Sequence, residues 1–168
     1  ANSKTFAMIN DKLDDFSKKY QFDFDVYIEH AVGQGEATRQ RYQRDPEKEC
    51  RYFGADLEDS AIDKAMEEQK KGNLPVEMKF IRQADIGAPD ILIDGVKKNQ
   101  ANPFGAVMVV GNGFHEVRNQ TNEKMIEVFK GYCEAGILII FTEESGLSDE
   151  DLLFTGWNTY HAGFRYCH

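Results

Sequence analysis

The sequence has 168 residues, of which 41% are hydrophobic and 29% charged, as is ordinary for one globular domain with a full core. Its 29 acidic and 20 basic residues give a net charge of −9, which argues against nucleic acid or an anionic membrane as the main partner. The chain shows no signal peptide and no apolar run near the roughly 18 residues that a membrane helix needs, so a cytoplasmic location is the default expectation.

The three cysteines, Cys50, Cys133 and Cys167, lie far apart in the sequence. No Cys-x-x-Cys pair and no Cys/His spacing indicates a zinc site. We therefore expect free thiols in a reducing compartment and no bound metal. These features leave the oligomeric state open.

Hydrophobic periodicity predicts alternating helices and strands. Apolar residues three and four apart predict helices over residues 3–20 and 121–134, and helices are also expected over 36–44 and 61–71. Apolar runs predict buried strands over 24–28, 50–55, 76–83, 104–110 and 136–141. The apolar residues of 87–102 are compatible with a short helix, but the Gly, Pro and Asn residues there weaken that prediction. Arg39, Arg41 and Arg44 are expected on a solvated helix face.

Strands that alternate with helices and are apolar throughout are typical of a parallel sheet covered on both faces. We therefore predict an α/β fold, a three-layer, Rossmann-like, doubly wound and mostly parallel sheet, in one domain over 1–168. Its parts are an N-terminal helix (1–20), a ligand-binding core (24–144) and a C-terminal sheet edge (145–168). The aromatic-rich end predicts a sixth strand or half a hairpin, whose side chains either form core, which is favoured, or wall a substrate pocket.

Three of the predicted strands end on an acidic residue: Glu29, Asp56 and Asp85. In an open parallel sheet, ligands bind beyond the carboxyl ends of the strands. If these strands are neighbours, the acids line one crevice and suit a ligand with several donors, such as an amine, ribose hydroxyls and an exocyclic amine. The first acid opens the segment 29–35 (E-H-A-V-G-Q-G), whose small residues let a ligand lie against the backbone. Each acid alone is equally compatible with a helix cap or a solvated loop.

Two phosphate-binding alternatives fit this segment less well. The dinucleotide fingerprint G-x-G-x-x-G would have Thr38 in its third glycine place, and Glu29 would repel a pyrophosphate. The P-loop pattern G-x-x-x-x-G-K-[ST] is absent from the sequence. A nicotinamide-dependent oxidoreductase is therefore a disfavoured alternative.

The ordered series of these segments resembles the class I S-adenosylmethionine-dependent methyltransferases. The first motif of that family, acid-x-Gly-x-Gly-x-Gly, is similar to E-H-A-V-G-Q-G, with Ala31 in the first glycine place. The second and third motifs are similar to Y-F-G-A-D-L and I-R-Q-A-D-I, and the fourth and fifth strands to G-A-V-M-V-V-G-N-G-F-H-E-V and E-A-G-I-L-I-I-F-T-E-E. The match spans about 24–144. It implies a seven-stranded sheet in the order 3-2-1-4-5-7-6 with strand 7 antiparallel, and this chain is short for the last two strands.

The resemblance implies S-adenosyl-L-methionine as cofactor and S-adenosyl-L-homocysteine as product. Glu29 would anchor the methionine end of the cofactor, Asp56 would accept from the ribose hydroxyls and Asp85 from the adenine amine. The remaining implied cofactor-binding residues form the floor of the site, flank the adenine or lie near the sulfonium: Ala31, Gly33, Gly35, Leu57, Ala84, Ile86, Gly111 and Asn112.

The implied activity is methyl transfer to a small-molecule acceptor by in-line displacement at the sulfonium methyl. His115 follows the fourth strand, and its ordinary pKa of about 6.5 suits a general base. Glu116 would orient it or act in its place, and a packing or capping role for His115 also stays open. His30 is expected to face solvent or the N-terminal helix. A non-catalytic module that binds the cofactor or its demethylated product is the second function left open.

Overall fold

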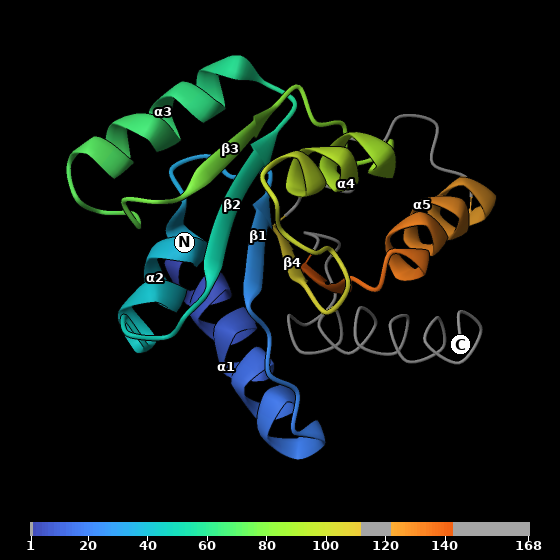
Figure 1. The fold of residues 1–168 in the computed structure, drawn as a ribbon, viewed down its shortest axis with the longest axis horizontal. Helices are drawn as coiled ribbons and strands as arrows, with labels where there is room; N and C mark the ends of the chain where they lie inside the picture. The colour runs from blue at the N-terminus through green and yellow to red at the C-terminus, as the bar shows by residue number, and fades with distance from the viewer. Residues whose placement is uncertain (1, 112–121, 143–168) are drawn as a thin grey trace.

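The structure, a computed structural model, describes residues 2–111 and 122–142, which form three layers, with helices on both faces of a central sheet (Figure 1). The five strands of the described part are all parallel, in the order β3-β2-β1-β4-β5. The predicted α/β, doubly wound parallel sheet is therefore confirmed. The predicted C-terminal sheet edge, 145–168, lies outside the described residues.

The strands are β1 (Val26–His30), β2 (Arg51–Asp56), β3 (Lys79–Arg82), β4 (Val107–Gly111) and β5 (Leu138–Thr142). The helices are α1 (Asn2–Tyr20), α2 (Glu36–Arg44), α3 (Asp59–Lys70), α4 (Pro89–Lys98) and α5 (Asn122–Glu134). The segment 87–102, which the sequence left open, thus contains a helix. It forms because proline is well placed in a first helical turn, and because Leu92, Ile93 and Val96 share one buried face.

Two apolar clusters fill the spaces between the layers. Ile9 and Leu13 of α1 and Ile62 of α3 pack on one face of the sheet, and Leu92 of α4 and Val128 of α5 pack on the other. Each of these side chains is almost fully buried, and such burial stabilises by roughly 1.5–3 kcal/mol per side chain. The two clusters hold the sheet rigid, and with it the loops that follow its strands.

The predicted strand limits are off by one to three residues, and three of these differences have a clear cause. β1 continues to His30 rather than residue 28, because it is a central strand with partners on both sides, Ala55 and Val110. β3 begins three residues later than predicted, since Val76 is 87% exposed in a turn. β4 also begins three residues later, and Phe104 lies outside it, more than half exposed. Exposed apolar side chains before a strand thus lengthened the predicted runs.

The interpretation of Arg39, Arg41 and Arg44 as one solvated face is wrong for Arg41. Its guanidinium is buried between α1 and α2, where it donates to Asn10 Oδ1 (3.1 Å) and pairs with Asp14 (2.7 Å). A buried charge requires such partners. This network connects α1 to α2.

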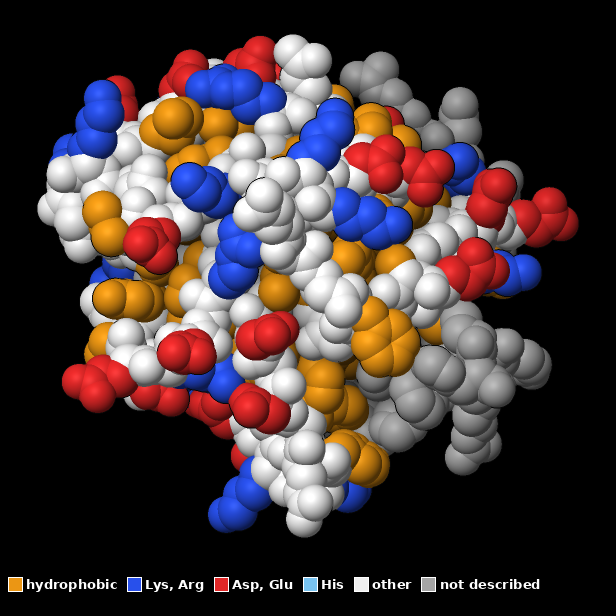
Figure 2. All heavy atoms as spheres, in the orientation of Figure 1, with side chains coloured by type: hydrophobic (Ala, Val, Ile, Leu, Met, Phe, Trp, Pro, Cys, Tyr) orange, Lys and Arg blue, Asp and Glu red, His pale blue; other side chains and the backbone are white. Residues whose placement is uncertain are grey.

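The face seen in Figure 2 carries Lys, Arg, Asp and Glu side chains of both signs among apolar ones. Cys50 is a free thiol, whereas Cys167 lies outside the described residues. Within 2–111 and 122–142, no helix is long and apolar enough to cross a membrane. The same residues contain no group of three or more His, Cys, Asp or Glu side chains suited to hold a metal ion.

Candidate functional site

The ends of β1, β2 and β3 are joined by backbone hydrogen bonds at one edge of the sheet. Val32 N–H, after β1, donates to the carbonyl of Ala55 in β2 (3.1 Å). Ala84 N–H, after β3, donates to the carbonyl of Asp56 at the end of β2 (3.0 Å). The loops that follow the three strands therefore lie side by side, and the predicted neighbour relation of these strands is confirmed.

A small cavity lies where these loops meet. Its volume of about 20 Å³ is room for about one water molecule, so a larger ligand would lie across it rather than inside it. Leu57 is 45% exposed and offers apolar surface at this place. The lining consists of His30 and six of the predicted cofactor-binding residues: Ala31, Asp56, Leu57, Ala84, Asp85 and Ile86.

Asp56 and Asp85 each use one carboxylate oxygen to fix their own turn. Asp56 Oδ1 accepts from Glu58 N–H (3.0 Å), and Asp85 Oδ1 accepts from Gly87 N–H (2.8 Å). Within the described residues, the second oxygen of each aspartate has no hydrogen-bond donor. An ionised carboxylate can accept several hydrogen bonds. The site therefore presents two oriented acceptors to a ligand.

Glu29 does not line this cavity, and the expectation that all three acids line one crevice is wrong for its side chain. Its carboxylate is 1% exposed and accepts from Thr38 N–H (2.9 Å), Thr38 Oγ1 (2.7 Å) and Ala37 N–H (3.4 Å). Because β1 extends to His30 and strand side chains alternate, Glu29 faces α2 and caps its first turn. Its predicted role at the methionine end of the cofactor stays a prediction.

Burial raises the pKa of Glu29 to about 7, although hydrogen bonds from Thr38 and Ala37 oppose the shift. The folded state then binds this proton more tightly than the unfolded chain. Stability contributed by Glu29 is therefore full below pH 4.5 and falls as the pH rises through 7. We expect the Glu29 carboxyl carbon to titrate near pH 7 by ¹³C NMR. Stability should fall over this pH range in the wild type more than in Glu29→Gln; a midpoint near 4.5 would contradict the assignment.

The backbone after β1 is left-handed at Ala31 (φ +61°), Gly33 (φ +50°) and Gly35 (φ +79°). A Cβ atom added at Gly33 would meet no atom within 4 Å, whereas one added at Gly35 would lie 2.8 Å from Leu74 Cδ2. The two glycines therefore have different roles. Gly33 leaves open space that a ligand could use, and Gly35 lets the loop pack closely on Leu74.

Ala31 occupies a backbone conformation that favours glycine, so we expect Ala31→Gly to stabilise the domain. The left-handed conformation costs an alanine about 1–2 kcal/mol, and the greater freedom of glycine in the unfolded chain offsets roughly 0.5–1 kcal/mol of the gain. Urea unfolding should show a net increase of about 0.5 kcal/mol. The control Ala61→Gly, in the first turns of α3, should instead lose about 1 kcal/mol; equal losses in both variants would contradict this account.

His30 is a site residue that the sequence interpretation missed. It is 2% exposed and lines the cavity, so the expectation that it faces solvent or the N-terminal helix is wrong. Its Nδ1 accepts from Ala31 N–H (3.1 Å). Within the described residues its Nε2 is buried without a hydrogen-bond partner. Side-chain alternation along a longer β1 would have placed His30 on the side opposite to Glu29.

The predicted residues near the fourth strand are only partly described. Gly111 is the last residue of β4, which lies beside β1, and it is paired with Thr142 of β5. Asn112, His115 and Glu116 lie outside the described residues. Their roles near the sulfonium and in proton transfer therefore stay predictions.

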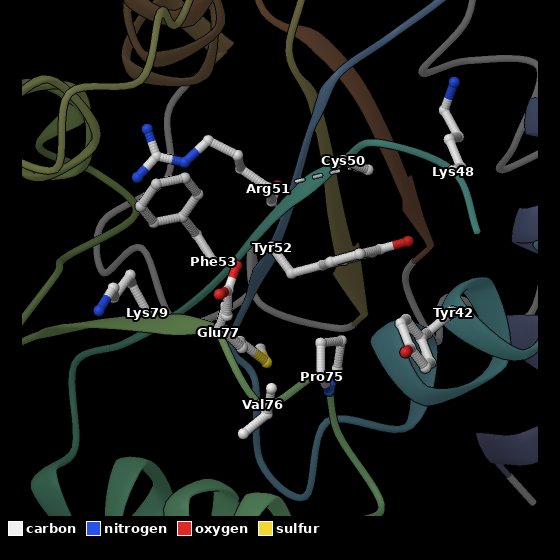
Figure 3. Close-up of a pocket in the computed structure, with 11 residues that line it drawn as sticks. Tyr42, Lys48, Cys50, Arg51, Tyr52, Phe53, Pro75, Val76, Glu77 and Lys79 are labelled. Atoms are coloured by element: carbon white, nitrogen blue, oxygen red, sulfur yellow. Dashed lines mark hydrogen bonds between the residues drawn. The ribbon is translucent and has the colours of Figure 1, made fainter. Parts of the chain in front are cut away.

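A larger cavity of about 470 Å³ lies at the amino ends of β2 and β3 (Figure 3). In Figure 3, Tyr52 points toward Tyr42, and their ring centroids are 5.9 Å apart. Its size alone would favour it as a ligand site. We place the candidate site at the other end of the sheet because parallel sheets bind ligands beyond the carboxyl ends of their strands. The unpartnered oxygens of Asp56 and Asp85 are also at that end.

The strand order, the glycine-containing turn after β1 and the aspartates at the end of β2 and after β3 define a Rossmann-like domain with one candidate ligand-binding edge. No protein-family profile matches the sequence, and no curated protein sequence matches it significantly.

Solved structures have the same fold. One is an S-adenosylmethionine-dependent methyltransferase from Clostridium acetobutylicum, with a TM-score of 0.59 and 15% identity over 86% of this chain and 52% of that one. Another is a candidate sarcosine dimethylglycine methyltransferase from Galdieria sulphuraria, with a TM-score of 0.58 and 10% identity over 98% of this chain and 60% of that one. The chain thus has the class I methyltransferase fold, and its match spans less than two thirds of either protein.

Proposed function

We propose that this chain binds S-adenosyl-L-methionine at the edge formed by the ends of β1, β2 and β3, and that it serves methyl transfer to a small molecule. The observation that carries the proposal is the pair of aspartates at the small cavity. Asp56 and Asp85 each keep one carboxylate oxygen without a partner among the described residues. Two fixed acceptors on neighbouring strand ends suit the ribose hydroxyls and the exocyclic amine of one nucleoside.

In this arrangement Asp56 accepts from the ribose hydroxyls and Asp85 accepts from the adenine amine. Leu57, Ala84 and Ile86 flank the ring. The open space over Gly33 admits the ligand close to the backbone, with Gly111 and Asn112 assigned to the sulfonium end. The bound cofactor supplies an activated methyl group, and the residues of the chain supply its orientation.

A dinucleotide cofactor fits this site less well for a structural reason. Pyrophosphate groups bind to the free N–H groups at a helix N-terminus. In α2 the N–H groups of Ala37 and Thr38 already donate to Glu29. A pyrophosphate would have to displace a buried carboxylate to reach them. The nicotinamide-dependent alternative therefore stays disfavoured.

A module that binds the cofactor without catalysis is the second candidate. The residues that would bind the methyl acceptor are not identified by the described site. Transfer of a labelled methyl group to members of a broad acceptor panel would support catalysis, whereas cofactor binding without any transfer would support the binding module.

Calorimetric titration with S-adenosyl-L-methionine, S-adenosyl-L-homocysteine and NAD tests the cofactor. We expect the first two to bind and NAD not to bind; NAD binding alone would overturn the proposal.

Asp56→Ala should lower the affinity for S-adenosyl-L-homocysteine by about tenfold to a hundredfold, since a hydrogen bond to a charged group is worth roughly 1.5–3 kcal/mol. Asp94→Ala, a change of the same type on the exposed side of α4, should leave the affinity unchanged.

His115→Ala tests the proposed general base. A base that accepts a proton in the transition state contributes roughly 10²–10⁴-fold to the rate. We therefore expect methyl transfer to an acceptor with an ionisable proton to fall by at least about a hundredfold, with unchanged cofactor affinity. An unchanged rate would remove His115 from the mechanism, and a comparable fall in Glu116→Gln alone would assign the role to Glu116.

A further inference from the structure

His30 carries a hydrogen-bond donor that the described residues leave unused. Burial lowers the pKa of His30 to about 4, opposed by the negative charge of Asp85, so the imidazole is neutral at pH 7. A neutral imidazole has one N–H group. Because Nδ1 accepts from Ala31 N–H, the hydrogen resides on Nε2. This N–H group is buried and has no acceptor within residues 2–111 and 122–142.

Such a group needs a partner, since a buried donor without an acceptor costs roughly 1–3 kcal/mol. His30 lines the same cavity as Asp56 and Asp85, whose second oxygens have no donor among the residues that the structure describes. The cavity volume of about 20 Å³ matches one water molecule, and buried waters occur where two to four polar groups surround such a volume. The residues that line the cavity thus include one donor and two acceptors for a water.

We propose that His30 holds one water molecule in this cavity and that the water donates a hydrogen bond to a ring nitrogen of the bound adenine. The water accepts from His30 Nε2–H and donates one hydrogen to an aspartate oxygen. Its second hydrogen remains for the ligand. Asp85 accepts from the exocyclic amine, and the water donates to a ring nitrogen. These two groups together distinguish adenine from a base that has a carbonyl in place of the amine and an N–H group in place of that ring nitrogen. This inference rests on the proposed function.

A binding cycle with base analogues tests the inference. The probes are S-adenosyl-L-homocysteine and its 1-deaza, 3-deaza and 7-deaza analogues, each of which has a C–H group in place of one ring nitrogen. The proteins are the wild type, His30→Leu and His30→Gln. Leucine cannot donate, whereas the amide nitrogen of glutamine is a donor at similar reach. Thermal unfolding of each variant verifies that it is folded.

In the wild type we expect one deaza analogue to bind about tenfold more weakly than the parent compound, the size of one lost hydrogen bond. His30→Leu should bind the parent and that analogue equally, and His30→Gln should restore part of the difference. If His30 has a purely structural role, its substitution should weaken the binding of all four probes alike, and that result would overturn the proposal. Equal affinity of the wild type for all four probes would also overturn the proposal.

A crystal structure of the wild type with S-adenosyl-L-homocysteine gives a second readout. We expect a water within hydrogen-bond distance of both His30 Nε2 and a ring nitrogen. A direct bond from Nε2 to Asp85 or to the ligand would overturn the water assignment while leaving the proposed function intact. Failure of S-adenosyl-L-homocysteine to bind at all would overturn the proposed function, and this inference with it.

Discussion

Gly33→Asn will abolish binding of S-adenosyl-L-homocysteine and leave the domain folded. Asparagine tolerates the left-handed conformation that Gly33 adopts (φ +50°). Its Cβ lies in a volume where no atom of the described residues is within 4 Å, so we expect the described fold to accommodate it. The ligand does conflict sterically with the asparagine, because this side chain occupies the space proposed for the cofactor. We expect calorimetry to show a loss of at least about a hundredfold, or roughly 2.8 kcal/mol.

Gly72→Asn is the matched control for this change. Gly72 is also left-handed (φ +84°) and free of Cβ contacts, but it follows the C-terminus of α3. The control should bind S-adenosyl-L-homocysteine as the wild type does, and both variants should melt close to the wild type. Normal affinity in Gly33→Asn would show that the ligand does not approach this turn.

Gly35→Ala is expected to be the most destabilising single change in the loop after β1. The left-handed backbone at Gly35 (φ +79°) costs an alanine about 1–2 kcal/mol. The added Cβ would lie 2.8 Å and 2.9 Å from the two methyl groups of Leu74, and overpacking of this kind costs about 1–3 kcal/mol. Together they lower the free energy of unfolding by about 3 kcal/mol, measured by urea denaturation.

Gly72→Ala separates the two contributions. Gly72 has the same backbone conformation without the Leu74 contact, so this variant should lose only the conformational part, about 0.5 kcal/mol net of the greater freedom of glycine in the unfolded chain. The difference between the two variants measures the collision with Leu74. Equal losses would mean that Leu74 moves aside without cost, and that Gly35 is required for its backbone alone.

Much of the fold could be predicted from the sequence because the strands are buried on both faces and read as continuous apolar runs. The helix α4 could not, since Pro89 and Gly95 weaken a helical pattern whose buried face becomes evident only against the sheet. The strand limits failed where exposed apolar side chains, such as Val76 and Phe104, extend a run into a turn. Burial of these positions depends on the tertiary structure.

The candidate site could also be predicted in part from the sequence. Asp56 and Asp85 follow strand ends, and strand order alone brings them together. Glu29 and His30 could not be assigned, because their directions depend on how far β1 continues, and that is set by pairing with β2 and β4. An error of two residues in one strand end places both side chains incorrectly. His30 can therefore be assigned to the candidate site only from the folded structure.

We propose that the ligand binds at the carboxyl ends of β1, β2 and β3. Backbone amide NMR spectra, recorded while S-adenosyl-L-homocysteine is added, test it most directly. We expect the largest shifts in residues 30–35, 56–57 and 84–86. Shifts centred instead on Tyr42, Tyr52 and Val76, around the larger cavity of Figure 3, or no shifts at all, would contradict it.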